Sequence, residues 1–389
     1  MNDAFIEQTP FFTAGHRSLA SSVASFVDRE IETRAIEERD ADERTREYVA
    51  LLATAGVLRY AVATQDQPLD VRALCLIREA LAYSSSLADS AFVMQGLGTY
   101  AIAQAAPDHV RDFWLARAAD GKALAAFALT EPEAGSDVAG IQTTAQRDGD
   151  TYVINGNKRF ISNAGIADFY TVFARTNTRA DGRPELSAFV VSAKIPGFSV
   201  VERTALMAPH PIGEIKFSGC RVPAEDMVGA EGDGFRLAMQ TMDTFRASVG
   251  AAACGMARRA LDEALRYAGA RKQFGRLLAE HQLVQEKLAD MITELDAARL
   301  LVYRAAYLKD SGAERVTREA SEAKLFATEA ASRIIDQAMQ IHGATGLLRG
   351  SVVERLYRDV RALRIYEGTS EIQKLVIAGQ LLKDGDPAR

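Results

Sequence analysis

The chain has 389 residues, of which 48% are hydrophobic and 25% charged, and its net charge is −6 at pH 7. This composition is typical of a globular protein that is long enough for two or three packed units. The interleaved acidic and basic residues, with acids in excess, argue against nucleic acid or an anionic membrane as the main partner.

The sequence predicts no processing segment, membrane span or metal site. The N-terminus lacks a basic segment followed by an apolar run, and no window of 18 apolar residues is present. Cys75, Cys220 and Cys254 are far apart, which favours a reduced compartment, and we expect a cytoplasmic protein. The five histidines are scattered without paired spacing, so we predict no metal ligands.

The first segment, residues 1–122, is predicted to be helical. Apolar residues recur at helical spacing from Leu19 to Ile31, and further helices are predicted over 48–56, 69–83 and 88–105. Asp89 comes just after three serines, near the start of the last of these helices. The preferred interpretation is an acid that points away from any ligand, caps its helix and is favoured by the helix dipole; a substrate contact is the alternative.

The second segment, residues 123–230, is predicted to be a β-domain. A short apolar run, Ala123–Leu129, opens it, and strand signals punctuated by Pro and Gly follow to about Val228. Residues 152–154 and 159–161 flank Asn155-Gly156, and Asn-Gly predicts a hairpin turn there.

The third segment, residues 231–389, is predicted to be helical again. Two apolar stripes, one from Val284 to Val302 and one from Leu325 to Ile341, indicate packed helices. Small residues on these faces are typical of a bundle. The whole pattern predicts a mainly α protein with a central β-domain: an N-terminal helical bundle, a β-barrel-like middle domain and a C-terminal four-helix bundle.

Four stretches could bind a ligand, and each has a plainer reading. The loop Leu129–Gly140 offers hydroxyls and backbone N–H groups, or is a surface loop. Phe160 and Ser162 lie two apart on a strand, where they would stack on and hydrogen-bond to a flat ring, or belong to the core and the surface. Arg271 would meet a phosphate, or is helix-end charge. The glycines of Gln340–Gly346 permit close approach of a ligand, or cap a helix.

Glu367 is the candidate base. It stands between a bulky apolar run and Gly368-Thr369-Ser370, which predicts a turn between two helices, with Thr or Ser capping the second. Apolar neighbours on one side would raise the pKa of its carboxyl toward that of a useful base. A surface glutamate in a helix-helix loop is the alternative.

Taken together, these stretches resemble the acyl-CoA dehydrogenase family along nearly the whole chain. The loop Ala128–Gly140 matches the family's first signature throughout, whereas Gln340–Asp359 departs from the second at Ala344 and Gly350. The stretch Met207–Gly213 is also atypical of the fatty-acid branch. The resemblance implies a homotetrameric flavoenzyme with FAD, which converts an acyl-CoA to a trans-2-enoyl-CoA and passes electrons to an electron-transfer flavoprotein.

The resemblance also implies roles for particular residues. Glu367 would be the catalytic base, unopposed because the alternative base position of some relatives holds Phe245. Ser162 would stand beside flavin N5, and Phe160 would lie against the isoalloxazine ring. The other implied FAD contacts are Phe127, Leu129, Thr130, Ser136, Arg271, Phe274, Gln282, Gln340, Gly343 and Thr369, with Arg271, Phe274, Gln340 and Gly343 reaching a neighbouring subunit's FAD. The implied substrate contacts are Ser136, Asp243, Arg246 and Gly368.

The resemblance limits the substrate only loosely. Glutaryl-type members carry an arginine where this chain has Ala88, so a distal carboxylate is not expected. A short or medium acyl chain is the first expectation. A cyclic or functionalised acyl group is the second, because Asp89 would suit an alkyl chain poorly. An acyl-CoA oxidase, a flavin monooxygenase on the same fold and a non-catalytic FAD-binding protein are the alternatives.

Overall fold

The computed structural model describes residues 3–36, 40–64, 67–180 and 182–384. The chain divides into two compact units. The helical unit comprises residues 1–38, 70–89 and 243–389, and the sheet unit comprises residues 39–69 and 90–242. Helices α6 (Ser86–Ala105) and α8 (Gly234–Ala270) contribute residues to both units.

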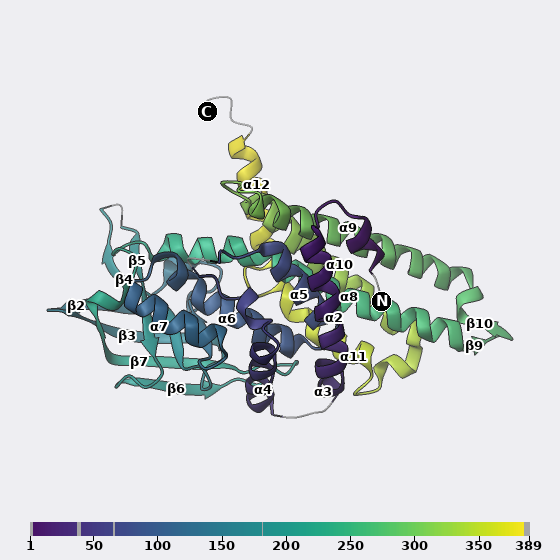
Figure 1. Ribbon diagram of the computed structural model, residues 1–389, viewed down its shortest axis with the longest axis horizontal. Helices are drawn as coiled ribbons and strands as arrows, with labels where there is room; N and C mark the ends of the chain where they lie inside the picture. Colours follow the sequence, from purple (N-terminus) through teal and green to yellow (C-terminus); the bar gives the residue numbers. More distant parts are fainter. Residues whose placement is uncertain (1–2, 37–39, 65–66, 181, 385–389) are drawn as a thin grey trace. The chain divides into compact units, whose positions relative to one another are not determined.

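The sheet unit is built on an eight-stranded sheet with the order β6-β7-β3-β2-β4-β5-β8, and β1 pairs in parallel with β4 (Figure 1). Helices α4 (Ala41–Thr54) and α7 (Asp108–Ala119) and most of α6 belong to the same unit. The strands are β1 (Ala125–Ala128), β2 (Thr144–Asp148), β3 (Thr151–Ser162), β4 (Phe169–Thr178), β5 (Pro184–Ser192), β6 (Phe198–Arg203), β7 (Ile212–Pro223) and β8 (Met227–Val228).

Strand β4 shows where the core of the sheet unit lies. Phe169 and Phe173 belong to a buried cluster that includes Ile102 of α6 and Leu115 of α7. Tyr170 and its alternate neighbours belong to a second cluster on the other face. Because successive side chains of a strand point to opposite faces, β4 is buried on both sides and reads as a continuous apolar run.

The hairpin predicted at Asn155-Gly156 is wrong. Strand β3 runs through these residues without turning, and the chain reverses instead at Gly149, between β2 and β3. A register shift between β3 and β7 occurs at Ile154/Asn155, and Gly156 has φ +151°. A Cβ on Gly156 would lie 2.7 Å from the Cα of Thr143. The glycine therefore serves a bulge and a close backbone approach, which the dipeptide alone does not distinguish from a turn.

The helical unit contains most of α8, together with α9 (Gln282–Asp310) and α10 (Thr317–His342), and α9 and α10 lie side by side (Figure 1). A Cβ on Gly250 of α8 would lie 2.7 Å from a methyl group of Val302 and 3.2 Å from the carbonyl oxygen of Ala323. Small residues thus permit close helix packing, as predicted for a bundle. The remaining elements are α1 (Ala4–Gln8), α2 (Ala14–Phe26), a π-helix (Val27–Ile31), α3 (Glu32–Ile36), α5 (Val71–Ser84), β9 (Lys272–Gln273), β10 (Arg276–Leu277), α11 (Val352–Val360) and α12 (Ser370–Asp384).

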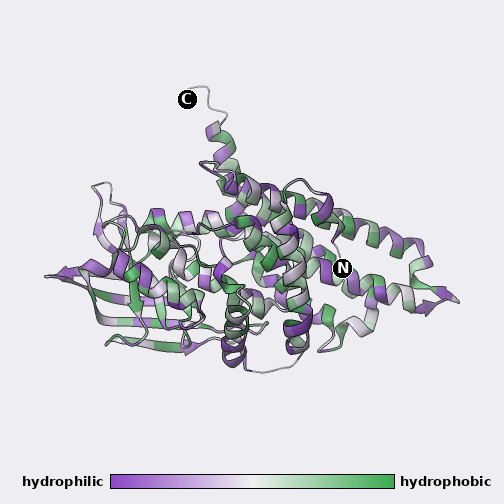
Figure 2. Cartoon of the chain, in the orientation of Figure 1, coloured by the Kyte–Doolittle hydropathy of each residue, from purple (hydrophilic) through white to green (hydrophobic). Residues whose placement is uncertain are grey.

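The two predicted apolar stripes are largely buried. Met291, Leu295 and Val302 of α9, and Ile334 and Ile335 of α10, have at most 2% of their surface exposed. Ile292 departs from the prediction, with 43% exposed. Hydrophobic and hydrophilic residues are interleaved along α9 in Figure 2, as expected for a helix with one buried stripe. Among the described residues, no helix combines the length and the apolar character that a membrane crossing requires.

Candidate active site

Glu367 lies in a strained turn between the 3-10 helix Arg361–Arg364 and α12. Its φ is +53°, an unfavourable value for a residue with a side chain, and Gly368 follows with φ +89°. Thr369 Oγ1 accepts a hydrogen bond from the Ile372 amide and so caps α12. These features confirm the predicted turn and cap. Strain of this kind persists only where surrounding contacts hold it.

Two buried side chains hold the backbone of this turn. Lys324 Nζ donates to the Gly368 carbonyl at 2.7 Å, and Gln373 Nε2 donates to the same carbonyl at 2.9 Å and to that of Glu367 at 3.2 Å. Lys324 and Gln373 are both fully buried. A Cβ on Gly368 would lie 2.6 Å from Gln373 Nε2, so only glycine fits there. Neither Lys324 nor Gln373 was predicted from the sequence.

The carboxyl of Glu367 is in an environment suited to a base. Its Oε2 is buried and has no hydrogen-bond partner among the described residues. Burial raises the pKa of Glu367, and the charges of Arg78, Lys324 and Arg246 partly offset this effect. Burial also lowers the pKa of Lys324 to about 8. The predicted direction of the Glu367 shift and its cause are therefore confirmed.

Asp89 corrects a prediction. It lies in the first turn of α6, as expected, but the hydroxyl that accepts from the Ala88 amide in this turn is Ser85 Oγ, and the Asp89 carboxylate has a different partner. Arg78 of α5 binds it through two nitrogens, both at 2.7 Å, and the third nitrogen donates to Ser248 Oγ at 2.8 Å. The guanidinium is 1% exposed and the carboxylate 4%. Both charges are thus paired inside the protein, and Asp89 presents no bare charge to a ligand.

Arg78 was not predicted from the sequence. Its signal is a single cation within the apolar stretch Leu74–Leu81, which is unusual for a solvent-exposed residue. The partner is eleven residues further along, in the next helix, so no regular helical spacing joins the two charges.

Asp243 and Arg246 lie one helical turn apart on α8 and bind each other. Arg246 Nη1 donates to Asp243 Oδ1 at 2.7 Å, and Thr317 Oγ1 donates to Asp243 Oδ2 at 2.7 Å. Arg246 is 7% exposed, and Phe245 between them is fully buried. The pair lies in the helical unit with Glu367, and the charge of Arg246 acts on the pKa of the Glu367 carboxyl.

In the sheet unit, Phe160 and Ser162 lie at the end of β3 as predicted for a ring-binding pair. Phe160 is 50% exposed with φ +54°, whereas Ile161 between the two is 1% exposed. Ser162 Oγ is 2.7 Å from Nε2 of His210, a residue that the sequence analysis did not single out. The register of β3 against β7 shifts between Lys158 and Ile161, so the regular alternation of a strand does not hold at Phe160. The exposed ring and the nearby hydroxyl still offer stacking and a hydrogen bond to a flat ligand.

A buried ion pair supports the loop after β1. Lys158 Nζ donates to Glu131 Oε1 at 2.8 Å and to the Leu129 carbonyl at 3.0 Å. The Glu131 carboxylate also accepts from the amides of Gln142 and Thr143. Of the four residues predicted here, Leu129 is 7% exposed, Phe127 and Thr130 are half-buried, and Ser136 is exposed. The pair, which the sequence analysis also missed, fixes the conformation of this loop.

The remaining predicted residues gather at a different place in the helical unit. Tyr267 of α8 stacks on His342 of α10 with ring centroids 4.4 Å apart, which joins the C-terminal ends of these helices. Phe274, between β9 and β10, is 94% exposed. In Figure 1 the β9–β10 end lies well away from α12. Exposed residues at this end include Arg271, Gln282, Gln340 and Gly343.

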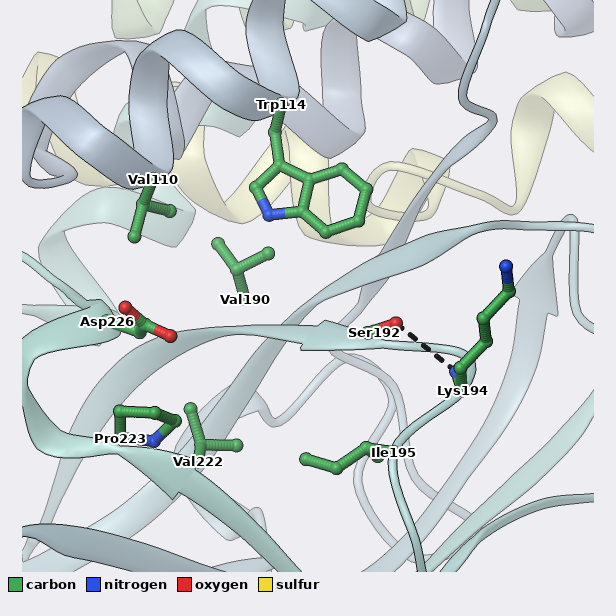
Figure 3. Close-up of a pocket in the computed structure, with 9 residues that line it drawn as sticks. All are labelled: Val110, Trp114, Val190, Ser192, Lys194, Ile195, Val222, Pro223 and Asp226. Carbon is green, nitrogen blue, oxygen red and sulfur yellow. Dashed lines mark hydrogen bonds between the residues drawn. The ribbon is translucent and has the colours of Figure 1, made fainter.

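One open pocket of about 300 Å³ lies elsewhere in the sheet unit (Figure 3). Figure 3 shows Trp114 on one side and Ile195 and Val222 on the other, and none of the predicted site residues lines it. Asp226 at its rim is bound to His109 at 2.8 Å. The pocket therefore has no part in the candidate site.

Comparisons with known proteins show the family and the fold of this chain. Models of the acyl-CoA dehydrogenase N-terminal, middle and C-terminal domains match residues 13–122, 126–220 and 232–382. The 3-(aryl)acrylate reductase of Clostridium sporogenes is 40% identical over 379 residues, 96% of this chain and 100% of that one. Cyclohexane-1-carbonyl-CoA dehydrogenase of Geobacter metallireducens is 40% identical over 313 residues, 80% of this chain and 82% of that one. Butyryl-CoA dehydrogenase from Megasphaera elsdenii has a structure with TM-score 0.87 and 34% identity, covering 95% of this chain and 99% of that one.

Proposed function

Because this chain belongs to the acyl-CoA dehydrogenase family, and is therefore an oxidoreductase with FAD as its cofactor, we propose that it oxidises an acyl-CoA thioester to the trans-2-enoyl-CoA. Glu367 is the base that removes the α-proton. The observation that carries the proposal is the buried Oε2 of Glu367, which has no partner among the described residues, together with the raised pKa of this carboxyl.

The residues of this chain fit a flavin. Phe160 offers a half-exposed ring face, and Ser162 offers a hydroxyl beside it. Arg271 and Phe274 offer an exposed cation and an exposed ring to the phosphate-bearing part of FAD. When bound, the flavin accepts hydride from the β-carbon of the substrate. The further FAD contacts that we propose are Phe127, Leu129, Thr130, Ser136, Gln282, Gln340, Gly343 and Thr369.

The chain's own residues account for the proton transfer. The α-C–H of a thioester is a very weak acid, so the base needs a high proton affinity. Exclusion of water by the acyl chain would raise the pKa of Glu367 further in the complex. The unpartnered Oε2 keeps a lone pair free to take the proton. Lys324 and Gln373 hold the strained backbone so that the carboxyl does not relax away.

The substrate that we propose is a short, medium or cyclic acyl-CoA. Arg78 is fully engaged by Asp89 and Ser248, so this arginine is not available to bind a distal carboxylate. The same pairing removes the reason for expecting a polar substituent opposite Asp89. The proposal of a cyclic acyl group therefore depends on the similarity of this chain to the cyclohexane-1-carbonyl-CoA dehydrogenase. Asp243, Arg246, Ser136 and Gly368 are the proposed substrate contacts.

We further propose that the protein is a homotetramer that delivers electrons to an electron-transfer flavoprotein. Phe274 and Arg271 are exposed at the β9–β10 end, which lies well away from α12 in Figure 1, and this supports an assembly in which they bind a neighbouring protomer's cofactor. A second candidate function is the reverse reaction, reduction of a 2-enoyl thioester. The reductase that matches nearly the whole chain favours it.

Anaerobic bleaching of the bound flavin by a panel of straight, branched and cyclic acyl-CoAs tests the proposal. The wild type should bleach with at least one saturated thioester, and Glu367→Gln should retain FAD yet bleach about 10²-fold more slowly or worse. Glu371→Gln, an exposed neighbour on α12, is the matched control and should bleach normally. Bleaching of the Glu367→Gln variant at the wild-type rate would remove Glu367 from the base role. Rapid reoxidation of the reduced enzyme by air would favour an oxidase or monooxygenase.

A further inference from the structure

Two serines from different elements meet on one imidazole in the sheet unit. Nε2 of His210 is 2.7 Å from Ser162 Oγ at the end of β3, and Nδ1 is 3.1 Å from Ser90 Oγ on α6. All three residues belong to the sheet unit. The ring therefore joins the hydroxyl that lies beside the exposed Phe160 to a second hydroxyl behind it.

The loop between β6 and β7 holds the imidazole in this place. Pro209 and Pro211 flank His210, and proline fixes the backbone φ. The Pro211 carbonyl accepts from the amide of Asn163 at 2.7 Å, which ties the loop to the residue after Ser162. The Thr204 amide donates to the Ile212 carbonyl at 3.0 Å and closes the loop at its base.

The ring is neutral at pH 7, since burial lowers the pKa of His210 to about 4. A neutral imidazole has one N–H donor and one acceptor nitrogen, so one of the two serines donates to the ring and the other accepts from it. If Ser90 donates to Nδ1, then Nε2–H donates to Ser162, whose own O–H is free to donate to a ligand. In the other tautomer Ser162 presents a lone pair instead. In both cases His210 fixes the direction of the Ser162 hydroxyl.

We propose that His210 is a positioning residue of the flavin site: held by Ser90, it orients the Ser162 hydroxyl toward the edge of the bound isoalloxazine ring. This inference rests on the proposed function, in which Phe160 stacks on that ring. Reduction changes which atoms of the isoalloxazine ring donate and accept hydrogen bonds. A Ser162 hydroxyl held in one direction therefore binds one redox state of the flavin better than the other. His210 thereby sets the relative affinity of the protein for the two redox states of the flavin.

The test compares variants of His210 whose side chains keep a hydrogen-bonding group near Nε2, near Nδ1 or at neither position. Gln places its terminal amide near the position of Nε2, and Asn places its amide near that of Nδ1. His210→Gln can therefore keep the bond to Ser162, whereas His210→Asn and His210→Ala lose it. Ser162→Ala removes the hydroxyl itself, and His109→Ala is the control, because His109 is an exposed histidine of the same unit that binds Asp226.

The readouts are the visible spectrum and reduction potential of the bound FAD, measured without acyl-CoA against a reference dye. We expect Ser162→Ala, His210→Ala and His210→Asn to change the ratio of affinities for the two redox states about tenfold, which is about 30 mV for a two-electron couple. His210→Gln should shift the potential less, and His109→Ala should not shift it. The double variant Ser162→Ala/His210→Ala should shift it no further than Ser162→Ala alone.

A shift in Ser162→Ala with none in the FAD-loaded His210→Ala and His210→Asn variants would overturn the positioning role. No shift in any of the variants would overturn the placement of Ser162 at the ring, and the role of His210 with it. Because no substrate is used, these outcomes are separate from those for acyl-CoA oxidation, which depend on bleaching and on Glu367.

Discussion

The carboxyl of Glu367 lies in a place that favours its protonated form, so it should weaken the fold when it ionises. Its folded-state pKa is raised above the ordinary value of 4.5. The folded protein then holds a proton that the unfolded chain releases, and the stability contributed by this group falls as pH rises from about 4.5 through the raised pKa. We therefore expect Glu367, the proposed catalytic base, to lower the free energy of unfolding at neutral pH.

Glu367→Gln should therefore be more stable than the wild type at pH 7, with a difference that shrinks toward pH 4.5. Thermal denaturation of the FAD-loaded proteins across this range measures it. Glu371→Gln removes an exposed carboxylate whose pKa is lowered, so it should not reproduce the gain. A difference between Glu367→Gln and the wild type that does not vary with pH would contradict a raised pKa.

The Arg78–Asp89 pair should be costly to break, because removal of one partner leaves a charge buried without compensation. Asp89→Ala should lose about 3–5 kcal/mol of unfolding free energy in a denaturant titration. Asp148→Ala breaks the pair with Arg221, in which both side chains are more than half exposed, and should lose about 1 kcal/mol or less. Equal losses in the two variants would show that the Asp89 carboxylate is not the buried partner of Arg78.

At the scale of elements, Gly255 and Gly269 of α8 have opposite surroundings. A Cβ on Gly255 would lie 2.1 Å from the carbonyl oxygen of Glu79 in α5, whereas one on Gly269 has no atom within 4 Å. Gly255→Ala should separate the two helices and destabilise the protein. Gly269→Ala should be neutral or should stabilise it by up to about 1 kcal/mol, since Ala has the higher helix propensity. The melting temperatures of the two variants, measured against the wild type, test this. An increased melting temperature in both variants would exclude close packing at Gly255.

The elements themselves were largely predictable, because hydrophobic period and caps are local signals. The turn that carries Glu367 could be predicted as well, since its glycine, its capping threonine and its apolar neighbours lie within nine residues of sequence. The role of Glu367 as a base follows from the resemblance of the whole chain and stays a prediction. The hairpin at Asn155-Gly156 failed because glycine serves turns and bulges alike, and the close approach of Thr143 is a tertiary fact. The roles of Arg78, Lys324 and His210 could not be predicted either, because they depend on tertiary contacts. Their partners are respectively 11, 44 and 48 residues away, and such pairing leaves no periodic trace.

At the scale of the whole molecule, the exposed end of the helical unit is the surface where the proposed assembly is tested. Phe274 is 94% exposed, more than any other large hydrophobic side chain among the described residues, and Arg271 and Gln340 at the same end are also exposed. A ligand or another protomer that covered this ring would remove apolar surface from water, which is favourable. If that cover includes a neighbouring protomer's FAD, retention of the cofactor depends on assembly.

Arg271→Ala should therefore release FAD more readily than the wild type. Loss of one charge-assisted contact to phosphate costs roughly 1.5–3 kcal/mol, which is about 10- to 150-fold in the dissociation constant. Lys272→Ala removes the adjacent exposed cation and is the control for a general loss of positive charge. Ultrafiltration with absorbance of the filtrate measures FAD release, and light scattering measures the molar mass of the same sample. A monomer that keeps FAD at full occupancy, or equal release from the Arg271→Ala and Lys272→Ala variants, would remove Arg271 from a contact across the assembly.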